Sequence, residues 1–118
     1  MVSDSNKLPV AGNTALSAIE LEASLTALPG WTAAPAAAIG KSWRLPDFRQ
    51  AMAFANAVAE LAERLDHHPE LQVGWGRCAV RWTTHDAGGV TARDLDAAHR
   101  TDELAARHGA RADTAPAA

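Results

Sequence analysis

The chain has 118 residues, of which 47% are hydrophobic and 21% charged, and its formal net charge is −3 at pH 7. This size predicts one domain with a single core, and the acidic balance gives no general attraction for nucleic acid or an anionic membrane. Cys78 is the single cysteine, so no internal disulfide can form. Residues 1–13 lack the apolar stretch of a secretory signal, and no apolar run is long enough to span a bilayer. We therefore expect a cytoplasmic protein.

The two ends of the chain show little apolar periodicity. Residues 1–13 are expected to form a flexible leader, and the alanine-rich residues 109–118 a flexible tail. Residues 14–108 carry the recurring apolar positions of a folded domain.

The first part of this domain predicts a short helix followed by two strands. Apolar residues at helical spacing indicate a helix that Thr14 or Ser17 caps and that ends near Leu28. Residues 31–33 and 39–45 are then predicted to be strands, and alternate residues of the second strand share one face.

The longest predicted helix begins at Pro46-Asp47. It ends near His67, because Pro69 cannot continue a helix and disfavours helical backbone at His68. The apolar stripe of this helix is predicted to comprise Phe48, Met52, Ala55, Val58, Ala59, Ala62 and Leu65.

A hairpin and a third helix complete the domain. Residues 71–74 and 78–83 form the predicted hairpin, and Thr91 caps a helix that ends near His108, with Asp94 placed for a variant of the capping box. The element order predicts an α+β fold, a four-stranded antiparallel sheet with three helices packed on one face.

Histidines concentrate in two short segments at the ends of predicted elements. One segment is Asp66-His67-His68-Pro69-Glu70 and the other is Trp82-Thr83-Thr84-His85-Asp86. Imidazole can give or take a proton near neutral pH, and the carbonyl end of a helix favours its charged form. These segments therefore predict an acid and a base on opposite sides of a small pocket.

Two other interpretations compete with acid–base chemistry. The histidines could be solvated residues at caps and turns, or three histidines and a carboxylate could hold zinc or iron. Adjacent histidines such as His67 and His68 do not easily converge on one ion, and no cysteine supports such a site, so we expect no metal.

Tryptophans form a second unusual feature, since the chain has four and no tyrosine. Trp43 and Trp82 fall on strand faces and are expected in the core, whereas Trp75 in a turn is expected to be partly exposed. Trp31 could be either a core plug or a flat wall for an aromatic ligand.

The two histidine segments and their spacing resemble the pterin-4a-carbinolamine dehydratase family. The resemblance includes Glu63, residues 65–70, Trp75, residues 82–91 and Asp94. Upstream, Gly30-Trp31 and residues 39–48 resemble the family's first strands, so the similarity covers about residues 16–104. The family fold, an antiparallel sheet with helices on one side, agrees with the predicted element order.

This resemblance implies a dehydratase that acts on 4a-hydroxytetrahydrobiopterin or a related 4a-hydroxytetrahydropterin. Loss of water would give the quinonoid dihydropterin and so recycle the cofactor of aromatic amino acid hydroxylases. The pterin is the substrate, and no metal or organic cofactor is expected.

By the same resemblance, the catalytic residues would be His67, His68 and His85. His67 and His85 would be the main proton-transfer groups, and His68 would bind substrate and assist. The substrate-binding positions would be Trp31, Glu63, Pro69, Thr84, Asp86 and Asp94. Asp94 would also be available to orient His85, alongside its capping role.

The family further implies a homodimer or homotetramer built by pairing sheet edges, with functional coupling to an aromatic amino acid hydroxylase. Neither nucleic acid nor membrane is an expected partner. The alternative is a non-catalytic binding module on the same fold, of the kind that stabilises a transcription-factor dimer or helps to assemble Rubisco.

Overall fold

The computed structural model describes residues 14–113, and the predicted leader at residues 1–13 lies outside this range. In chain order, the elements are α2 (Ala18–Leu25), β1 (Thr32–Ala34), β2 (Ala38–Arg44), α3 (Phe48–Leu65), β3 (Glu70–Gly74), β4 (Arg77–Trp82), a short 3-10 helix η2 (His85–Ala87), α4 (Ala92–Arg107) and β5 (Arg111–Ala112). None of the helices within residues 14–113 has the length and apolar character needed to cross a bilayer.

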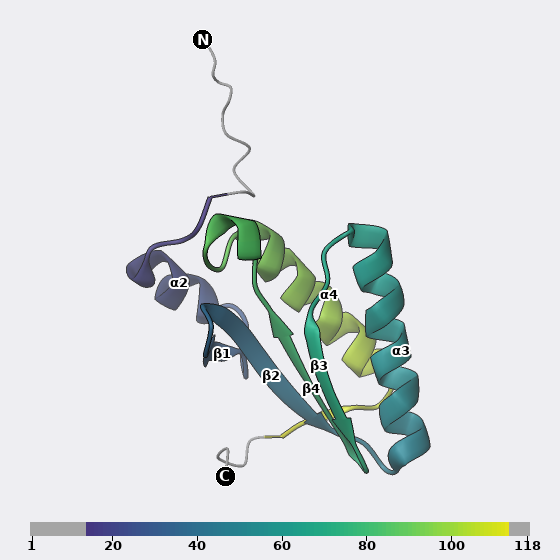
Figure 1. Cartoon of the computed structure of the whole chain (residues 1–118). Coiled ribbons are helices and arrows are strands. Elements are labelled where there is room, and N and C mark those ends of the chain that lie inside the picture. The colour runs from purple at the N-terminus through teal and green to yellow at the C-terminus, as the bar shows by residue number, and fades with distance from the viewer. Residues whose placement is uncertain (1–13, 114–118) are drawn as a thin grey trace.

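The sheet is antiparallel and has the strand order β1-β2-β4-β3, with β5 also paired to β2. Since β4 occupies one edge of β2, β1 and β5 lie one after the other along its opposite edge. The three long helices lie on one side of the sheet and leave the other face open (Figure 1). The predicted fold class is confirmed, with β5 as a short addition.

The C-terminal segment corrects one prediction. Residues 109–118 were expected to be flexible, but the backbone N–H of Ala110 donates to Ala105 and that of Asp113 donates to Ser42, both at 2.9 Å. Between these bonds, β5 pairs with residues 43–44 of β2. The free edge of β2 presents unpaired backbone groups, which recruit this segment whatever its composition. Residues 114–118 lie outside the described range.

Helix α3 begins and ends where predicted, and its buried face overlaps the predicted stripe only in part, at Ala55, Val58 and Ala62. The Asp47 carboxylate caps it by accepting from the Gln50 N–H at 2.8 Å. Of the predicted stripe, Phe48, Met52 and Ala59 are exposed. The face that packs on the sheet consists of Ala51, Phe54, Ala55, Val58, Leu61 and Ala62. Alanines occur on every side of this helix, so its sequence does not distinguish one face from the next. The larger side chains of Phe54 and Leu61 determine which face packs on the sheet.

The core lies between the open sheet and the helices, and it is built around aromatic rings. Trp43 contacts Trp31 edge to face at a centroid distance of 5.6 Å and Phe54 at 5.2 Å. Trp43 and Trp82 are buried, as predicted, and Trp75 is 75% exposed in the turn between β3 and β4. The arrangement leaves the C-terminal end of α3 beside the N-terminal end of α4, where the histidine segments meet.

Candidate active site

The end of α3 turns sharply and directs His67 toward α4. Asp66 closes the helix in the left-handed conformation, with φ at 50°, a region that aspartate tolerates better than most residues. The His67 N–H then donates to the Ala62 carbonyl at 3.1 Å, and Arg93 of α4 donates to the Asp66 carbonyl at 3.2 Å. These bonds join the two helix ends.

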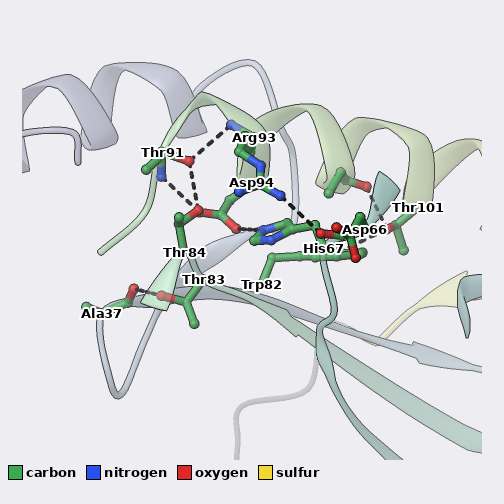
Figure 2. Close-up of polar contacts among 11 residues, drawn as sticks. Ala37, Asp66, His67, Trp82, Thr83, Thr84, Thr91, Arg93, Asp94 and Thr101 are labelled. Atoms are coloured by element: carbon green, nitrogen blue, oxygen red, sulfur yellow. Dashed lines mark hydrogen bonds and ion pairs between the residues drawn. The ribbon is translucent and has the colours of Figure 1, made fainter. Parts of the chain in front are cut away.

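His67 is held at one ring nitrogen by a buried carboxylate. Its Nε2 atom lies 2.6 Å from Oδ1 of Asp94, and Asp94 is fully buried. The other carboxylate oxygen accepts from the Thr84 hydroxyl at 2.7 Å and from the Thr91 N–H at 2.9 Å (Figure 2). Because an ionised carboxylate only accepts hydrogen bonds, His67 carries a proton on Nε2, directed at Asp94.

The second ring nitrogen of His67 is open. Within residues 14–113, no side-chain group bonds to its Nδ1 atom, and no buried side-chain nitrogen or oxygen lacks a partner. Nδ1 therefore retains some access to solvent, although the residue as a whole is only 9% exposed. One nitrogen anchors the ring and the other can exchange a proton with a ligand.

Trp82 fixes the plane of the same ring. The two rings stack with centroids 5.4 Å apart and planes inclined by 22°. The Trp82 indole N–H in turn donates to the Thr101 hydroxyl at 3.1 Å, and that hydroxyl donates to the Ala97 carbonyl at 2.7 Å. Sequence reasoning assigned Trp82 to the core alone; its place two residues before Thr84 is the signal that links it to the site.

His68 lies on the surface beside the same helix end. Its Nε2 atom is 2.6 Å from an Oε2 atom of Glu63, and the two side chains are 57% and 75% exposed. Pro69 follows and is half-buried. The structure thus brings Glu63 and His68 together as an exposed pair, next in the chain to His67 and Pro69.

His85 is exposed at the first position of η2, and Asp86 next to it is also exposed. The preceding residue, Thr84, is buried and bonded to Asp94, which places His85 one residue from the network that holds His67. The two histidine segments therefore meet through the Asp94 carboxylate.

The expectation that Asp94 orients His85 is not met, because the side-chain hydrogen bonds of Asp94 within residues 14–113 go to other groups. These groups are His67, Thr84 and the Thr91 N–H. The capping role of Asp94 is confirmed, since its bond to Thr91 closes the N-terminus of α4. The part of the chain that the structure describes contains no group of three or more histidine, cysteine, aspartate or glutamate side chains placed to hold a metal ion.

Trp31 occupies a core position away from the histidines. It is 3% exposed, and its indole N–H donates to both carboxylate oxygens of Asp102 at 3.1 Å. The ring therefore has no free face for a ligand, which corrects its predicted role as a pocket wall and favours the core-plug alternative. Lys41, which shares Asp102 at 2.9 Å, completes a polar cluster that the sequence pattern did not reveal.

Comparison with known proteins gives a consistent result. The family described as pterin 4 alpha carbinolamine dehydratase matches residues 14–104. Its relatives include two that are provisionally named as pterin-4-alpha-carbinolamine dehydratases. The one from Paracoccus denitrificans (strain Pd 1222) is 47% identical, and the match covers 79% of this chain and 88% of the relative. The one from Roseiflexus sp. (strain RS-1) is 44% identical, and the match covers 77% of this chain and 97% of the relative.

A solved structure agrees with these sequence matches. The crystal structure of a transcriptional coactivator/pterin dehydratase from Brucella melitensis superposes with a TM-score of 0.74 at 35% identity, covering 78% of this chain and 99% of that one. The chain belongs to the pterin-4a-carbinolamine dehydratase family.

Proposed function

We propose that the protein is a dehydratase that removes water from 4a-hydroxytetrahydrobiopterin, or a related 4a-hydroxytetrahydropterin, to give the quinonoid dihydropterin. Membership of the family supports the reaction. The observation that carries the proposal is the His67 ring, which is anchored to buried Asp94 at Nε2 and open at Nδ1. A general acid or base needs this combination of a fixed orientation and a free nitrogen.

The reaction requires two proton transfers. In the first, an acid gives a proton to the C4a hydroxyl, and the C4a–O bond breaks to release water. In the second, N5 loses its proton to a base, and the N5–C4a double bond forms. We propose that His67 and His85 carry out these two transfers, one on each side of the pterin. The proton gained by the base balances the proton given by the acid, so the total number of protons on the pair is unchanged, and proton exchange with water then returns each histidine to its starting state.

The remaining site residues would bind and position the pterin. The exposed His68 and Glu63 lie 2.6 Å apart, and Pro69 follows His68 in the chain. Asp86 is next to His85 and exposed. We propose that these groups contact the substrate, whereas Asp94 and Thr84, both buried, act through His67. The reaction as written needs no metal or organic cofactor, so chelators are expected to leave the rate unchanged.

The test is the dehydration of freshly generated 4a-hydroxytetrahydropterin, followed by ultraviolet absorbance. We expect the purified protein to accelerate the reaction well above its spontaneous rate, at concentrations far below that of the substrate. A rate equal to the spontaneous one would reject the proposal.

A second candidate is a non-catalytic protein-binding role on the same fold. The Brucella melitensis protein is described as a coactivator as well as a dehydratase, which supports this alternative. It becomes the leading function if the wild-type chain shows no acceleration. Catalysis that depends on His67 would favour the enzyme.

We also propose that the chain forms a homodimer or homotetramer by sheet-edge pairing. Within the described residues, β3 pairs only with β4, so its other edge presents unpaired backbone groups that can template pairing with a second copy. Light scattering at micromolar concentration should give a mass of twice 12.4 kDa or more, and a monomer mass would contradict it. Functional coupling to an aromatic amino acid hydroxylase and a cytoplasmic location stay predictions.

A further inference from the structure

Three exposed arginines lie side by side on the face of the sheet that the helices leave open. Arg44 of β2 stands directly opposite Arg77 of β4 and, across its other edge, directly opposite Arg111 of β5. Directly opposed residues of antiparallel strands point to the same face, with Cβ atoms about 5 Å apart. Their chain neighbours Trp43 and Cys78 are buried under the helices, so the arginines point to the open face. We call Arg44, Arg77 and Arg111 the arginine row.

Within residues 14–113, the arginine row is a concentration of positive charge that takes part in no ion pair. Like charges directly opposite one another destabilise a sheet. Other basic residues of the sheet have partners, since Arg81 pairs with Glu70, and Lys41 pairs with Asp102 at 2.9 Å. The ion pairs found among residues 14–113 join carboxylates to Lys41, His67, His68, Arg81 and Arg100. In a chain of net charge −3, such a local concentration of positive charge is a candidate site for an anionic ligand.

A hollow of about 770 Å³ lies beside the arginine row on the same face of the sheet. Small residues line it, among them Gly40, Ser42 and Ala79, and Arg77 lines it as well. Gly74, opposite Arg77 on β3, has no atom within 4 Å of the place where a Cβ would stand, so this end of the row is unobstructed. Arg77 therefore belongs both to the row and to the hollow.

We propose that the arginine row binds the phosphate groups of a small phosphorylated molecule whose uncharged part occupies the hollow. Guanidinium groups present a planar fork of N–H donors that matches phosphate oxygens. Ser42 and Gln72 line the hollow and supply uncharged hydrogen-bonding groups for the rest of the ligand.

The surroundings favour a small ligand over a long polyanion or a lipid surface. Glu70 and Asp113 also line the hollow, so a nucleic acid strand crossing this face would meet carboxylates. The surface is concave, whereas a bilayer needs a flat or convex face. This site is at the opposite end of β4 from Trp82 and on the other face of the sheet from His67, so it does not rest on the proposed dehydratase activity.

Isothermal titration calorimetry of the full chain with inorganic pyrophosphate tests this proposal, because its two phosphate groups can contact neighbouring arginines. We expect saturable binding that weakens as salt is raised. The double variant Arg44→Gln/Arg77→Gln should lose about tenfold or more in affinity, since bonds between charged groups are the strong ones. Arg100→Gln is the matched control, because Arg100 is exposed on α4, across the sheet from the row, and carries the same charge.

Circular dichroism and thermal melting at low salt check that the double variant folds; relief of the repulsion should leave its melting temperature equal or higher. If it fails to fold, Arg111→Gln alone should still weaken binding. No binding at millimolar pyrophosphate, or equal binding by the variants and wild type, would overturn the proposal. Binding of a single-stranded oligonucleotide or of phosphatidylserine vesicles without binding of pyrophosphate would also overturn it.

Discussion

The Nε2 atom of His67 lies 2.6 Å from Oδ1 of Asp94, although 27 positions separate the two residues in the chain. A carboxylate is costly to bury unless donors surround it. Thr84 and the Thr91 N–H complete that set of donors, so the pair with His67 leaves no carboxylate oxygen unsatisfied. The contact joins the end of α3 to the start of α4 and fixes the ring on which the proposed chemistry depends.

Asp94→Asn is expected to lower kcat about a hundredfold or more while changing KM little. An amide has one accepting oxygen, so it cannot accept from His67 at one atom and from Thr84 and Thr91 at the other. If its oxygen faces Thr91, its NH2 group faces His67 and moves the ring proton to Nδ1. Steady-state kinetics measures the loss, with circular dichroism as a folding check. Asp96→Asn, exposed on the same helix, is the control, and an unchanged kcat in folded Asp94→Asn would contradict the account.

His68→Ala is expected to raise KM more than it lowers kcat, because His68 is exposed and would mainly contact substrate. Its pair with Glu63 is solvated, so Glu63→Gln should change the free energy of unfolding by less than about 1 kcal/mol. Urea denaturation and initial-rate kinetics measure the two effects. A kcat loss in His68→Ala as large as that in His67→Ala would mean that their roles are wrongly assigned.

Thr101→Val tests the support behind the stacked ring. The change keeps the shape of a fully buried side chain but leaves the Trp82 indole N–H without an acceptor, at a cost of about 1–3 kcal/mol in unfolding free energy. Thr26→Val, at an exposed helix cap, should cost much less. Urea denaturation compares the two, and equal stabilities would show that the indole bond contributes little.

Cys78 should resist alkylation in the folded protein. Burial raises the pKa of its thiol from 9.0 to about 11, which lowers the thiolate fraction at pH 8 by about a hundredfold. Iodoacetamide labelling, read by mass spectrometry, should therefore be slow in buffer and fast in denaturing urea. Equal labelling rates would contradict the burial of this side chain.

The same thiol makes stability depend on alkaline pH. Its pKa is higher in the folded chain than in the unfolded chain, so above about pH 9 the unfolded state releases a proton that the folded state keeps. This contribution is fully present below pH 9 and is lost as the pH rises toward 11. Urea midpoints measured across this range should fall more steeply for wild type than for Cys78→Ala, and parallel curves would exclude the linkage.

The fold was largely predictable because its boundaries have local causes. Asp47 caps α3 through a bond to its own first turn, and Pro69 prevents the helix from continuing. The buried face of α3 was only partly predictable: Ala55, Val58 and Ala62 are buried as expected, but alanines occur on every side of the helix, and only contact with the sheet distinguishes Phe54 from Phe48. Strand β5 exists because the edge of β2 is free, which is a property of the sheet and not of residues 111–112.

The candidate site was predictable as a set of residues but not as a set of contacts. Motif spacing placed His67, His85 and Asp94 together, whereas the choice of His67 as the partner of Asp94 depends on how α3 and α4 pack. Similarly, a tryptophan after a Pro-Gly turn could line a ligand pocket or fill the core. The bond from Trp31 to Asp102, 71 residues away, holds its ring in the core.

The most direct test of the central claim is the rate of 4a-hydroxytetrahydropterin dehydration by wild type, His67→Ala and His85→Ala, measured side by side with His99→Ala. His99 is exposed on α4 and lies outside the site, which makes it the matched control. We predict rapid turnover by wild type and His99→Ala, and a fall of about a hundredfold or more in the other two. Near-normal turnover by folded His67→Ala would contradict the account.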